Sequence, residues 1–530
     1  MLRVFRIFPI LALAVFWTLS TRHLDLPGPY EDEVLLTIPA IHLITGKPDG
    51  PFGLHKNWKI GGRYIALLNQ DYLTYLKSYT FIPAFLLNGI NLKSVRLTGI
   101  VIAGVALLFG FYFMKGFAGL FPAVIGTVLL MTDLSYIFHN RHDWGPVSLM
   151  FLFKLSALYF LLKWWRTDRW MYFVVGTACL GLGVLDKANF AWFLFAGFLA
   201  FVLTCGLPRD RWRAKHVVIL VIFMLAGSFF YIDRNVFSRG RLFTLMKGDT
   251  KGWEKFEPGA LYQRARYHLN LLNNTLDGRV FYRFSTGQEL PTPSLFPWLF
   301  WLSVPFWVLF GRGRPAKFMF LLNVFTFVAF VLTPQAGGSH HTMAIYPFPH
   351  YFAAIVLSQL HERFGRTPRR LLVASGVVTV IIVAVSVSNL YGINIHYAAY
   401  QAGKTSKRWT EQIYPLVDYL RANKDRPAHV YDWGIRHNVL FLTEGEIELG
   451  EPYWSAMFDP DFEARFERTF PEPGVSYVLH TEEATFMGVA RDWFMARAKP
   501  KLEAGELRER LIGDGSQFVV YETVSLPRSK

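Results

Sequence analysis

Residues 95–114 read VRLTGIVIAGVALLFGFYFM, and residues 118–138 read AGLFPAVIGTVLLMTDLSYIF. Both runs match the roughly 20 residues that an α-helix needs to cross a lipid bilayer. Similar apolar runs lie near residues 5–21, 145–163, 170–186, 190–206, 216–232, 293–310, 318–333, 343–360 and 371–390. The sequence therefore predicts a polytopic α-helical membrane protein with about eleven transmembrane helices.

Composition favours a membrane protein over a soluble one. The chain of 530 residues is 52% hydrophobic and 17% aromatic, which is too apolar for a soluble protein of this size. Its only cysteines, Cys179 and Cys205, lie within apolar runs, so no disulfide framework or cysteine metal site is indicated. The basic start at Arg3 and Arg6 could belong to a signal peptide. No small-x-small cleavage site follows it, which favours a retained first span.

Clustered positive charge gives the predicted orientation. The formal net charge is +16, and the loops after the fourth, sixth, eighth and tenth predicted spans carry basic clusters at residues 163–169, 209–215, 312–317 and 363–370. With the N-terminus in the cytoplasm, all four clusters fall on the cytoplasmic side, as the positive-inside rule requires. Lipid bilayer is therefore an expected partner, and nucleic acid is not.

This orientation places three regions outside the cytoplasm: the loop at residues 22–94, the larger loop at residues 233–292, and the C-terminal tail. Within the first loop, residues 34–44 and 79–90 are too short to span a bilayer and contain proline. Such segments are typical of helices that lie at the membrane surface or re-enter it. A surface helix of this kind can carry a site that faces both lipid and water.

The C-terminal tail differs in pattern from the rest of the chain. Its apolar runs are short and strand-like, as at residues 429–433, 475–480 and 518–524, and polar stretches compatible with helices separate them. We therefore expect a transmembrane domain at residues 1–390 and an extracytoplasmic α/β domain at residues 391–530.

Three consecutive carboxylates, Glu31, Asp32 and Glu33, follow the first predicted span. One interpretation is the solvated first turn of a short helix, where acidic side chains complement the helix dipole. The other is a functional cluster at the membrane boundary. The spacing of these residues is equally compatible with both.

A second polar cluster, HNRHDWGP, lies between the third and fourth predicted spans and contains Arg141, His142 and Asp143. A turn between two helices needs polar residues and Gly-Pro in any case. Ionisable groups at a membrane boundary are nevertheless costly and tend to be functional. This cluster is therefore a candidate site.

A third cluster, Asp186 and Lys187 in GLGVLDKANF, interrupts a long apolar stretch. It is either an internal ion pair or snorkelling turn, or a carboxylate and a cation that face a polar cavity. Weaker candidates are Lys77, which could meet a phosphate, and His340 and His341, which could line the same cavity. For each of them the residues alone favour an ordinary solvated loop residue.

Other catalytic motifs are absent from the sequence. It contains no Gly-rich phosphate loop, no zinc-binding HExxH, no GxSxG nucleophile elbow and no CxxC pair. Chemistry on soluble nucleotides is therefore not supported.

The order of these motifs resembles a known class of membrane enzyme. Asp32 and Glu33 in YEDEVLLTIPA, Arg141 and Asp143 after the third span, and GLGVLDK ending at Lys187 are similar to motifs of GT-C glycosyltransferases. In particular, they resemble bacterial relatives of protein O-mannosyltransferases and of aminoarabinose lipid A transferases. The resemblance covers about residues 5–390 in layout and implies a GT-C fold.

The resemblance also implies an activity and its location. The expected reaction is inverting transfer of a hexosyl or pentosyl group from a polyprenyl-phosphate-linked donor to a hydroxyl of an envelope acceptor. That acceptor would be a glycolipid such as lipid A, a glycan or a protein, and the site would lie at the outer face of the bacterial inner membrane. A divalent cation is compatible with this class, although no residue set here resembles a closed metal cage.

The resemblance further implies roles for the candidate residues. Asp32 would be the general base, with Glu33 as the substitute for that role. Lys187, Arg141 and Lys77 would bind the donor phosphate. The remaining candidates would orient the acceptor or line the donor and acceptor cavity, namely Asp143, His142, Asp186, His340 and His341.

Three alternative functions remain open on the sequence alone. A transporter or flippase of lipid-linked sugars would also place charged residues within spans, but it is expected to show repeat symmetry and interrupted helices near the bilayer midplane. A glycan polymerase or ligase would transfer a preassembled chain. A non-catalytic scaffold that presents the C-terminal domain would not need the acidic cluster.

Overall fold

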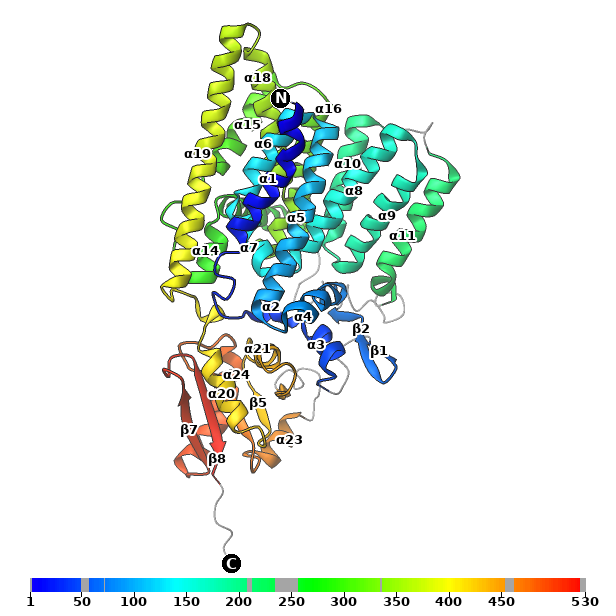
Figure 1. Cartoon of the computed structure of the whole chain (residues 1–530). Helices are drawn as coiled ribbons and strands as arrows, with labels where there is room; N and C mark the ends of the chain where they lie inside the picture. The colour runs from blue at the N-terminus through cyan, green and yellow to red at the C-terminus, as the bar shows by residue number, and fades with distance from the viewer. Residues whose placement is uncertain are drawn as a thin grey trace, which may run out of the picture.

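The computed structural model of the chain describes residues 2–48, 57–70, 72–206, 212–233, 256–333, 336–452 and 462–524. A layer of long helices forms one part of the molecule, and a smaller domain of helices and strands lies beyond one end of it (Figure 1). Short helices and a hairpin from the first outer loop lie between the two parts (Figure 1).

Every predicted span coincides with helical structure. The helices of the layer are α1 (Leu2–Ser20), α5 (Leu92–Phe117), α6 (Leu120–Met131), α7 (Leu134–His142), α8 (Val147–Thr167), α9 (Trp170–Asp186), α10 (Phe190–Cys205), α11 (Ala214–Ile232), α15 (Phe296–Phe310), α16 (Arg314–Leu332), α18 (Phe348–Phe364) and α19 (Pro368–Gln401). Over the described ranges, 5 of them are long and apolar enough to cross a membrane, or up to 6 if the bent pair α6 and α7 is one span. Shorter apolar helices, α9 and α10 among them, accompany these. The chain is thus a multi-pass helical membrane protein, and the count of about eleven spans stays a prediction.

The predicted run at residues 118–138 is two helices, α6 and α7, bent by 60°. Asp133 lies at the bend, where its carboxylate accepts a hydrogen bond from the backbone N–H of Tyr136 at 2.7 Å and so caps α7. The other carboxylate oxygen lies 3.1 Å from the ring of His350 on α18. Asp133 therefore anchors the bend, and the bend directs α7 and its polar C-terminal residues away from the axis of α6.

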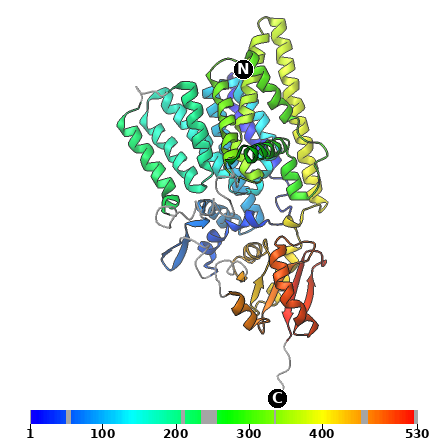
Figure 2. The same ribbon diagram turned by 180° about the vertical axis from the view of Figure 1, so that it is seen from behind.

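Close helix packing holds the layer together. Helix α8 packs against α5 and α9, α9 packs against α11, and α10 packs against α16 (Figures 1 and 2). At the contact of α9 with α11, a side chain on Gly227 would meet the carbonyl oxygen of Gly181 at 2.2 Å. Only glycine permits this approach, which brings the two backbones into contact.

The first outer loop forms a set of short elements. They are α2 (Glu31–Leu35), α3 (Ile38–Thr45), β1 (Asn57–Ile60), β2 (Arg63–Ala66), β3 (Leu68–Gln70), β4 (Leu73–Thr74), the 3₁₀-helix η1 (Leu76–Thr80) and α4 (Ile82–Asn88). The predicted surface helices at residues 34–44 and 79–90 overlap α3 and α4. The second outer loop contributes α13 (Pro258–Leu276) and α14 (Arg279–Thr286), and α17 (Ser339–Thr342) with η4 (Met343–Ile345) precedes α18.

The C-terminal part is built on a mixed sheet. Its elements are η5 (Lys407–Trp409), α20 (Ile413–Ala422), β5 (Ala428–Val430), α21 (Arg436–Leu442), α23 (Phe462–Thr469), β6 (Ser476–His480), α24 (Gly488–Glu503), β7 (Leu507–Ile512) and β8 (Phe518–Thr523). The strand order is β5-β6-β8-β7, with β5 parallel to β6 and the other pairs antiparallel. The predicted domain boundary after residue 390 falls within α19, which continues to Gln401.

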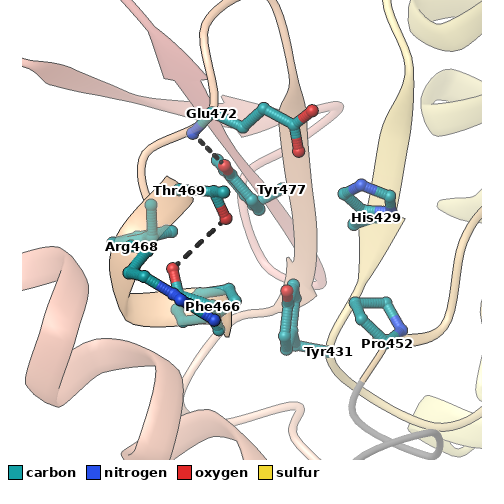
Figure 3. Close-up of a pocket in the computed structure, with 9 residues that line it drawn as sticks. His429, Tyr431, Pro452, Phe466, Arg468, Thr469, Glu472 and Tyr477 are labelled. Atoms are coloured by element: carbon teal, nitrogen blue, oxygen red, sulfur yellow. Dashed lines mark hydrogen bonds between the residues drawn. The ribbon is translucent and has the colours of Figure 1, made fainter. Parts of the chain in front are cut away.

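A cavity of about 560 Å³ opens beside an aromatic cluster of this C-terminal part (Figure 3). Its lining includes Tyr431, Phe466 and Tyr477, which are buried in the cluster, together with Arg468 and Glu472. The hydroxyl of Tyr477 accepts a hydrogen bond from the backbone N–H of Glu472 at 2.7 Å (Figure 3). No residue that the sequence marked as a candidate lines this cavity.

Candidate active site

Of the three acidic residues of α2, Asp32 alone is partly exposed to solvent. Tyr30 precedes the helix in an extended conformation, and all three carboxylates occupy the first turn, where the helix dipole favours negative charge. Glu31 and Glu33 are buried, whereas Asp32 is half-buried. The Tyr30 hydroxyl donates a hydrogen bond to Asp32 Oδ2 at 2.9 Å, and the Trp144 indole also donates to this carboxylate.

The surroundings of Asp32 make it a stronger base. Burial raises the pKa of its carboxyl group above the ordinary 3.8, and the neighbouring Glu31 carboxylate adds to the rise. The hydrogen bond from Tyr30 and the ammonium of Lys187 oppose this rise. A partly exposed carboxylate with a raised pKa suits proton removal from a substrate.

Glu33 is occupied by a buried ion pair. Arg96 on α5 donates from Nε to Oε1 at 2.8 Å and from Nη2 to Oε2 at 3.0 Å, and the ring of His142 lies 3.3 Å from Oε1. Burial alone would raise the pKa of Glu33, but Arg96 and His142 outweigh it and hold the pKa at about 2. Since both oxygens are bound and the side chain is 0% exposed, Glu33 is poorly placed to act as the substitute base.

Arg141 was predicted to bind the donor phosphate, but its guanidinium contacts backbone carbonyls. Its fully buried guanidinium donates to the backbone carbonyls of Ser20, Arg22, His23 and Leu26. These bonds anchor the chain that leaves α1, and they occupy both Nη groups, while the buried Nε has no hydrogen-bond partner among the described residues. We therefore leave Arg141 out of the phosphate-binding set.

Lys77 and Asp143 form a buried ion pair. Asp143 ends α7 in a left-handed conformation, with φ 41°, and its Oδ1 accepts a hydrogen bond from the backbone N–H of Ser148 at 2.9 Å. The Lys77 ammonium also donates to Ser148 Oγ at 2.5 Å. The turn after α7 therefore holds the lysine of η1 in place, and Ser148 is a partner that the sequence did not reveal.

Lys187 links the acidic residues of the site. Its ammonium interacts electrostatically with Asp186, Asp32 and Asp143, and it donates a hydrogen bond to the carbonyl of Gly145 at 3.2 Å. Its backbone forms a β-bridge with Leu73 of β4, so the first outer loop is tied directly to the end of α9. Residues from three distant stretches of sequence thus meet at Lys187.

The two histidines of the outer turn lie at the edge of this cluster. The ring of His340 lies 4.7 Å from that of Trp144 and 4.1 Å from that of His341. Gly145 has a left-handed φ of +70°, and a side chain there would meet His340 at 2.8 Å and the Lys187 ammonium at 3.2 Å. The glycine therefore lets the lysine and the histidine approach each other.

The C-terminal part of the chain contacts the acidic helix through aromatic rings. The Tyr30 ring stacks on Trp409 with a centroid distance of 4.7 Å and meets Trp433 edge-on at 5.7 Å. Trp409 is buried, and its ring also contacts that of His142 at 4.8 Å. This contact was not recognisable from the sequence because it joins segments that are hundreds of residues apart.

His437 on α21 forms an ion pair with Glu31 in the same contact. Burial lowers the pKa of His437, but the carboxylates of Glu31 and Glu451 outweigh it, so the pKa lies above the ordinary 6.5. A histidine with a raised pKa contributes stability that is complete below the unfolded value and is lost as pH rises through the folded value.

We expect this pair to make the contact of α21 with α2 depend on pH. Hydrogen exchange at the amides of α2, corrected for intrinsic rates, should be slow below about pH 6.5 and should speed up as pH rises through the raised pKa. His437→Gln should remove that dependence and weaken the contact by about 1.5–3 kcal/mol, as for a hydrogen bond to a charged group. His361→Gln on α18 is the control, and an equal pH dependence in both variants would contradict the role of His437.

No group of three or more His, Cys, Asp or Glu side chains that could hold a metal ion occurs among the described residues. A divalent cation stays an expectation from the resemblance alone.

Comparison with known proteins gives the fold class. No protein-family model matches the chain, and no curated protein matches its sequence. ArnT from Cupriavidus metallidurans bound to undecaprenyl phosphate is similar at TM-score 0.58 and 15% identity, over 99% of both chains. The apo state of the same protein is similar at TM-score 0.59, over 99% of this chain and 98% of that one.

A second solved protein has a related fold. The archaeal oligosaccharyltransferase AglB from Archaeoglobus fulgidus is similar at TM-score 0.52 and 12% identity, over 99% of this chain and 75% of that chain. The resemblance to GT-C glycosyltransferases is thus confirmed at the level of the fold. The chain has the fold of these membrane proteins along its whole length.

Proposed function

We propose that this protein is a membrane glycosyltransferase that moves a sugar from a polyprenyl-phosphate-linked donor to a hydroxyl of an envelope acceptor. The observation that carries the proposal is a half-buried carboxylate, Asp32, in electrostatic contact with Lys187 at the outer-loop end of the helical layer. The fold shared with ArnT bound to undecaprenyl phosphate supports a lipid-linked donor.

Asp32 is the proposed general base. It accepts the proton of the acceptor hydroxyl while that oxygen attacks the anomeric carbon. The bond from the anomeric carbon to the phosphate oxygen breaks in the same displacement, and the configuration at that carbon inverts. Tyr30 and Trp144 hold the carboxylate by hydrogen bonds, so its direction is fixed before substrate binds.

Lys187 and Lys77 are the proposed cations for the departing polyprenyl phosphate. Negative charge grows on the leaving oxygen, and ammonium groups held in place stabilise it without further reorganisation. Asp143 positions Lys77 through their ion pair, and Asp186 interacts electrostatically with Lys187. His340 and His341 are proposed to border the same cavity, and His142 is proposed to support α2 through Glu33.

The proposed location is the inner membrane of a bacterium, with the N-terminus in the cytoplasm. The basic clusters of the sequence support this orientation. The outer loops and the C-terminal part beyond α19 are then extracytoplasmic, on the side where a lipid-linked sugar would meet an envelope acceptor.

The test is transfer of radiolabelled sugar from a panel of polyprenyl-phosphate sugars to an envelope extract by the purified protein. We expect transfer by the wild type and a fall of about 10²- to 10³-fold in Lys187→Gln, the loss seen when one charge-stabilising donor is removed. Lys163→Gln, at the other end of the layer, should transfer normally. If the wild type consumed no donor, a transporter or a scaffold would replace the enzyme.

A further inference from the structure

A fixed turn joins α19 to the C-terminal part of the chain. Its residue Trp409 is buried against Tyr30, as described above. Before it, Ser406 donates from its backbone N–H to the carbonyl of Ser285 and from its hydroxyl to the carbonyl of Phe284, both at 2.8 Å. The two residues between these anchors, Lys407 and Arg408, are exposed and basic.

Arg408 is held between two aromatic rings. Its guanidinium carbon lies 5.3 Å from the ring centre of Phe284 on α14 and 5.3 Å from that of Phe486 in the C-terminal part. Stacking of this kind orients the guanidinium plane and leaves its N–H edges free for an acceptor. In the described part of the chain, no carboxylate forms an ion pair with Arg408.

The loop that carries Phe486 is held in place by hydrogen bonds. The buried carboxylate of Asp432 accepts hydrogen bonds from the backbone N–H of Phe486 at 3.2 Å and of Met487 at 2.9 Å, and from the Thr485 hydroxyl at 2.7 Å. The loop that carries Phe486 is therefore ordered by one acid. Arg408 thus lies between an ordered loop of the C-terminal part and helix α14 of the second outer loop.

Lys407 adds a second positive charge that no carboxylate neutralises within the described residues. Its ammonium donates to the backbone carbonyls of Glu483 at 3.3 Å and Thr485 at 3.1 Å, which are neutral acceptors. Lys407 and Arg408 together border a narrow hollow of about 10 Å³ that also includes Pro29 and Glu31, so an anion would meet their exposed N–H groups and not enter the hollow. The hollow therefore combines two basic side chains with the start of the acidic helix.

One pair of stacked aromatic rings lies between Arg408 and Asp32, the proposed base. Phe284 stacks on Trp144 with a centroid distance of 3.9 Å and an interplanar angle of 2°, and Trp144 donates to Asp32. A substrate group that binds Arg408 would thus be one ring pair away from the reacting hydroxyl.

We propose that Arg408, assisted by Lys407, is an anion subsite that binds a phosphate or carboxylate group of the acceptor. A planar guanidinium binds both groups with two parallel hydrogen bonds, and unpaired positive charge draws anions to the site. The inference rests on the proposed function and narrows it, because it makes the acceptor an acidic molecule.

Binding of three matched probes tests the subsite without any transfer reaction. The probes are octyl glucoside, octyl glucuronide and the phosphate ester of octyl glucoside, measured by native mass spectrometry of the full chain in neutral detergent. All variants also carry Lys187→Gln, which suppresses the proposed donor cation. The tighter of the two acidic probes identifies the anionic group as phosphate or carboxylate.

We expect Arg408→Gln to weaken binding of the tighter acidic probe by about tenfold or more, the loss of one charge-assisted hydrogen bond. Arg408→Lys should retain part of the affinity for that probe. Arg363→Gln, an exposed arginine stacked on Phe310 at 4.8 Å, is the matched control and should bind as its parent does. The subsite would be overturned if Arg408→Gln and Arg363→Gln bound the acidic probe equally. It would also be overturned if the neutral octyl glucoside bound as tightly as the acidic probes.

The transfer assay then separates this inference from the proposed function. An envelope extract is divided on an anion exchanger into neutral and acidic acceptors. We expect label only in acidic acceptors and a raised KM for them in Arg408→Gln. Label in neutral acceptors, unchanged by Arg408→Gln, would contradict the anion subsite alone. Loss of all transfer with probe binding intact would contradict the glycosyltransferase alone.

Discussion

Asp32→Asn is expected to lower sugar transfer by about 10²- to 10⁴-fold, because the amide has the shape of the carboxylate but cannot accept the acceptor's proton. Binding of the donor should change little, so the loss should fall on kcat. The measurement is single-turnover transfer of radiolabelled sugar by the purified protein in detergent. Asp25→Asn, an exposed acid of the same outer loop, is the control and should leave transfer intact.

The pH profile gives a second readout for the same residue. Asp32 must be ionised to act as a base, and its pKa lies above 3.8. Transfer by the wild type should therefore fall as pH drops through this raised pKa, and the residual transfer of Asp32→Asn should lack that acid limb. If Asp32→Asn transferred sugar as fast as Asp25→Asn, our assignment of Asp32 as the base would be wrong.

Arg96→Met is expected to destabilise the protein by about 3–5 kcal/mol, because it leaves the carboxylate of Glu33 buried without its partner. Both carboxylate oxygens of Glu33 are bound by Arg96, and neither side chain is exposed. The measurement is unfolding of the purified protein in detergent, followed by intrinsic fluorescence. The exposed pair of Arg213 with Asp168 gives the control, since Arg213→Met should cost less than about 1 kcal/mol.

A double variant separates the ion pair from packing. Arg96→Met with Glu33→Met removes both charges together, so it should recover much of the stability lost in Arg96→Met. The wild type should also lose stability in acid, as pH falls from 4.5, the ordinary pKa of Glu33, to the folded value of about 2. Equal destabilisation in the single and double variants would show that packing, and not charge, dominates at this position.

The apolar helices of the layer were predictable from the sequence. An apolar run of bilayer length is a local property, and the run at 371–390 is recognisable without knowing its neighbours. The surface helices, too, were signalled by short apolar segments with proline. The fused run at 118–138 was harder, because the bend depends on Asp133 meeting His350 from another helix.

The candidate site was predictable as a list of residues but not as a set of roles. Asp32, Asp143, Asp186, Lys77 and Lys187 do gather at one end of the helical layer. Their proximity follows from the order of the spans, since helix ends on the same side share one face of the membrane. The supporting aromatic and polar side chains were not recognisable, namely Tyr30, Trp144, Ser148, Phe284, Arg408, Trp409 and His437.

The multi-pass helical architecture and the set of charged candidates follow from local sequence, because lipid requires continuous apolar helices and makes each charge within them conspicuous. Which of these acids is held in a buried ion pair depends on tertiary contacts. Adjacent carboxylates at 32 and 33 differ because Arg96 from a distant span binds one of them. Arg141 binds backbone carbonyls for the same reason: ion pairs and hydrogen bonds are set by which segments meet in space.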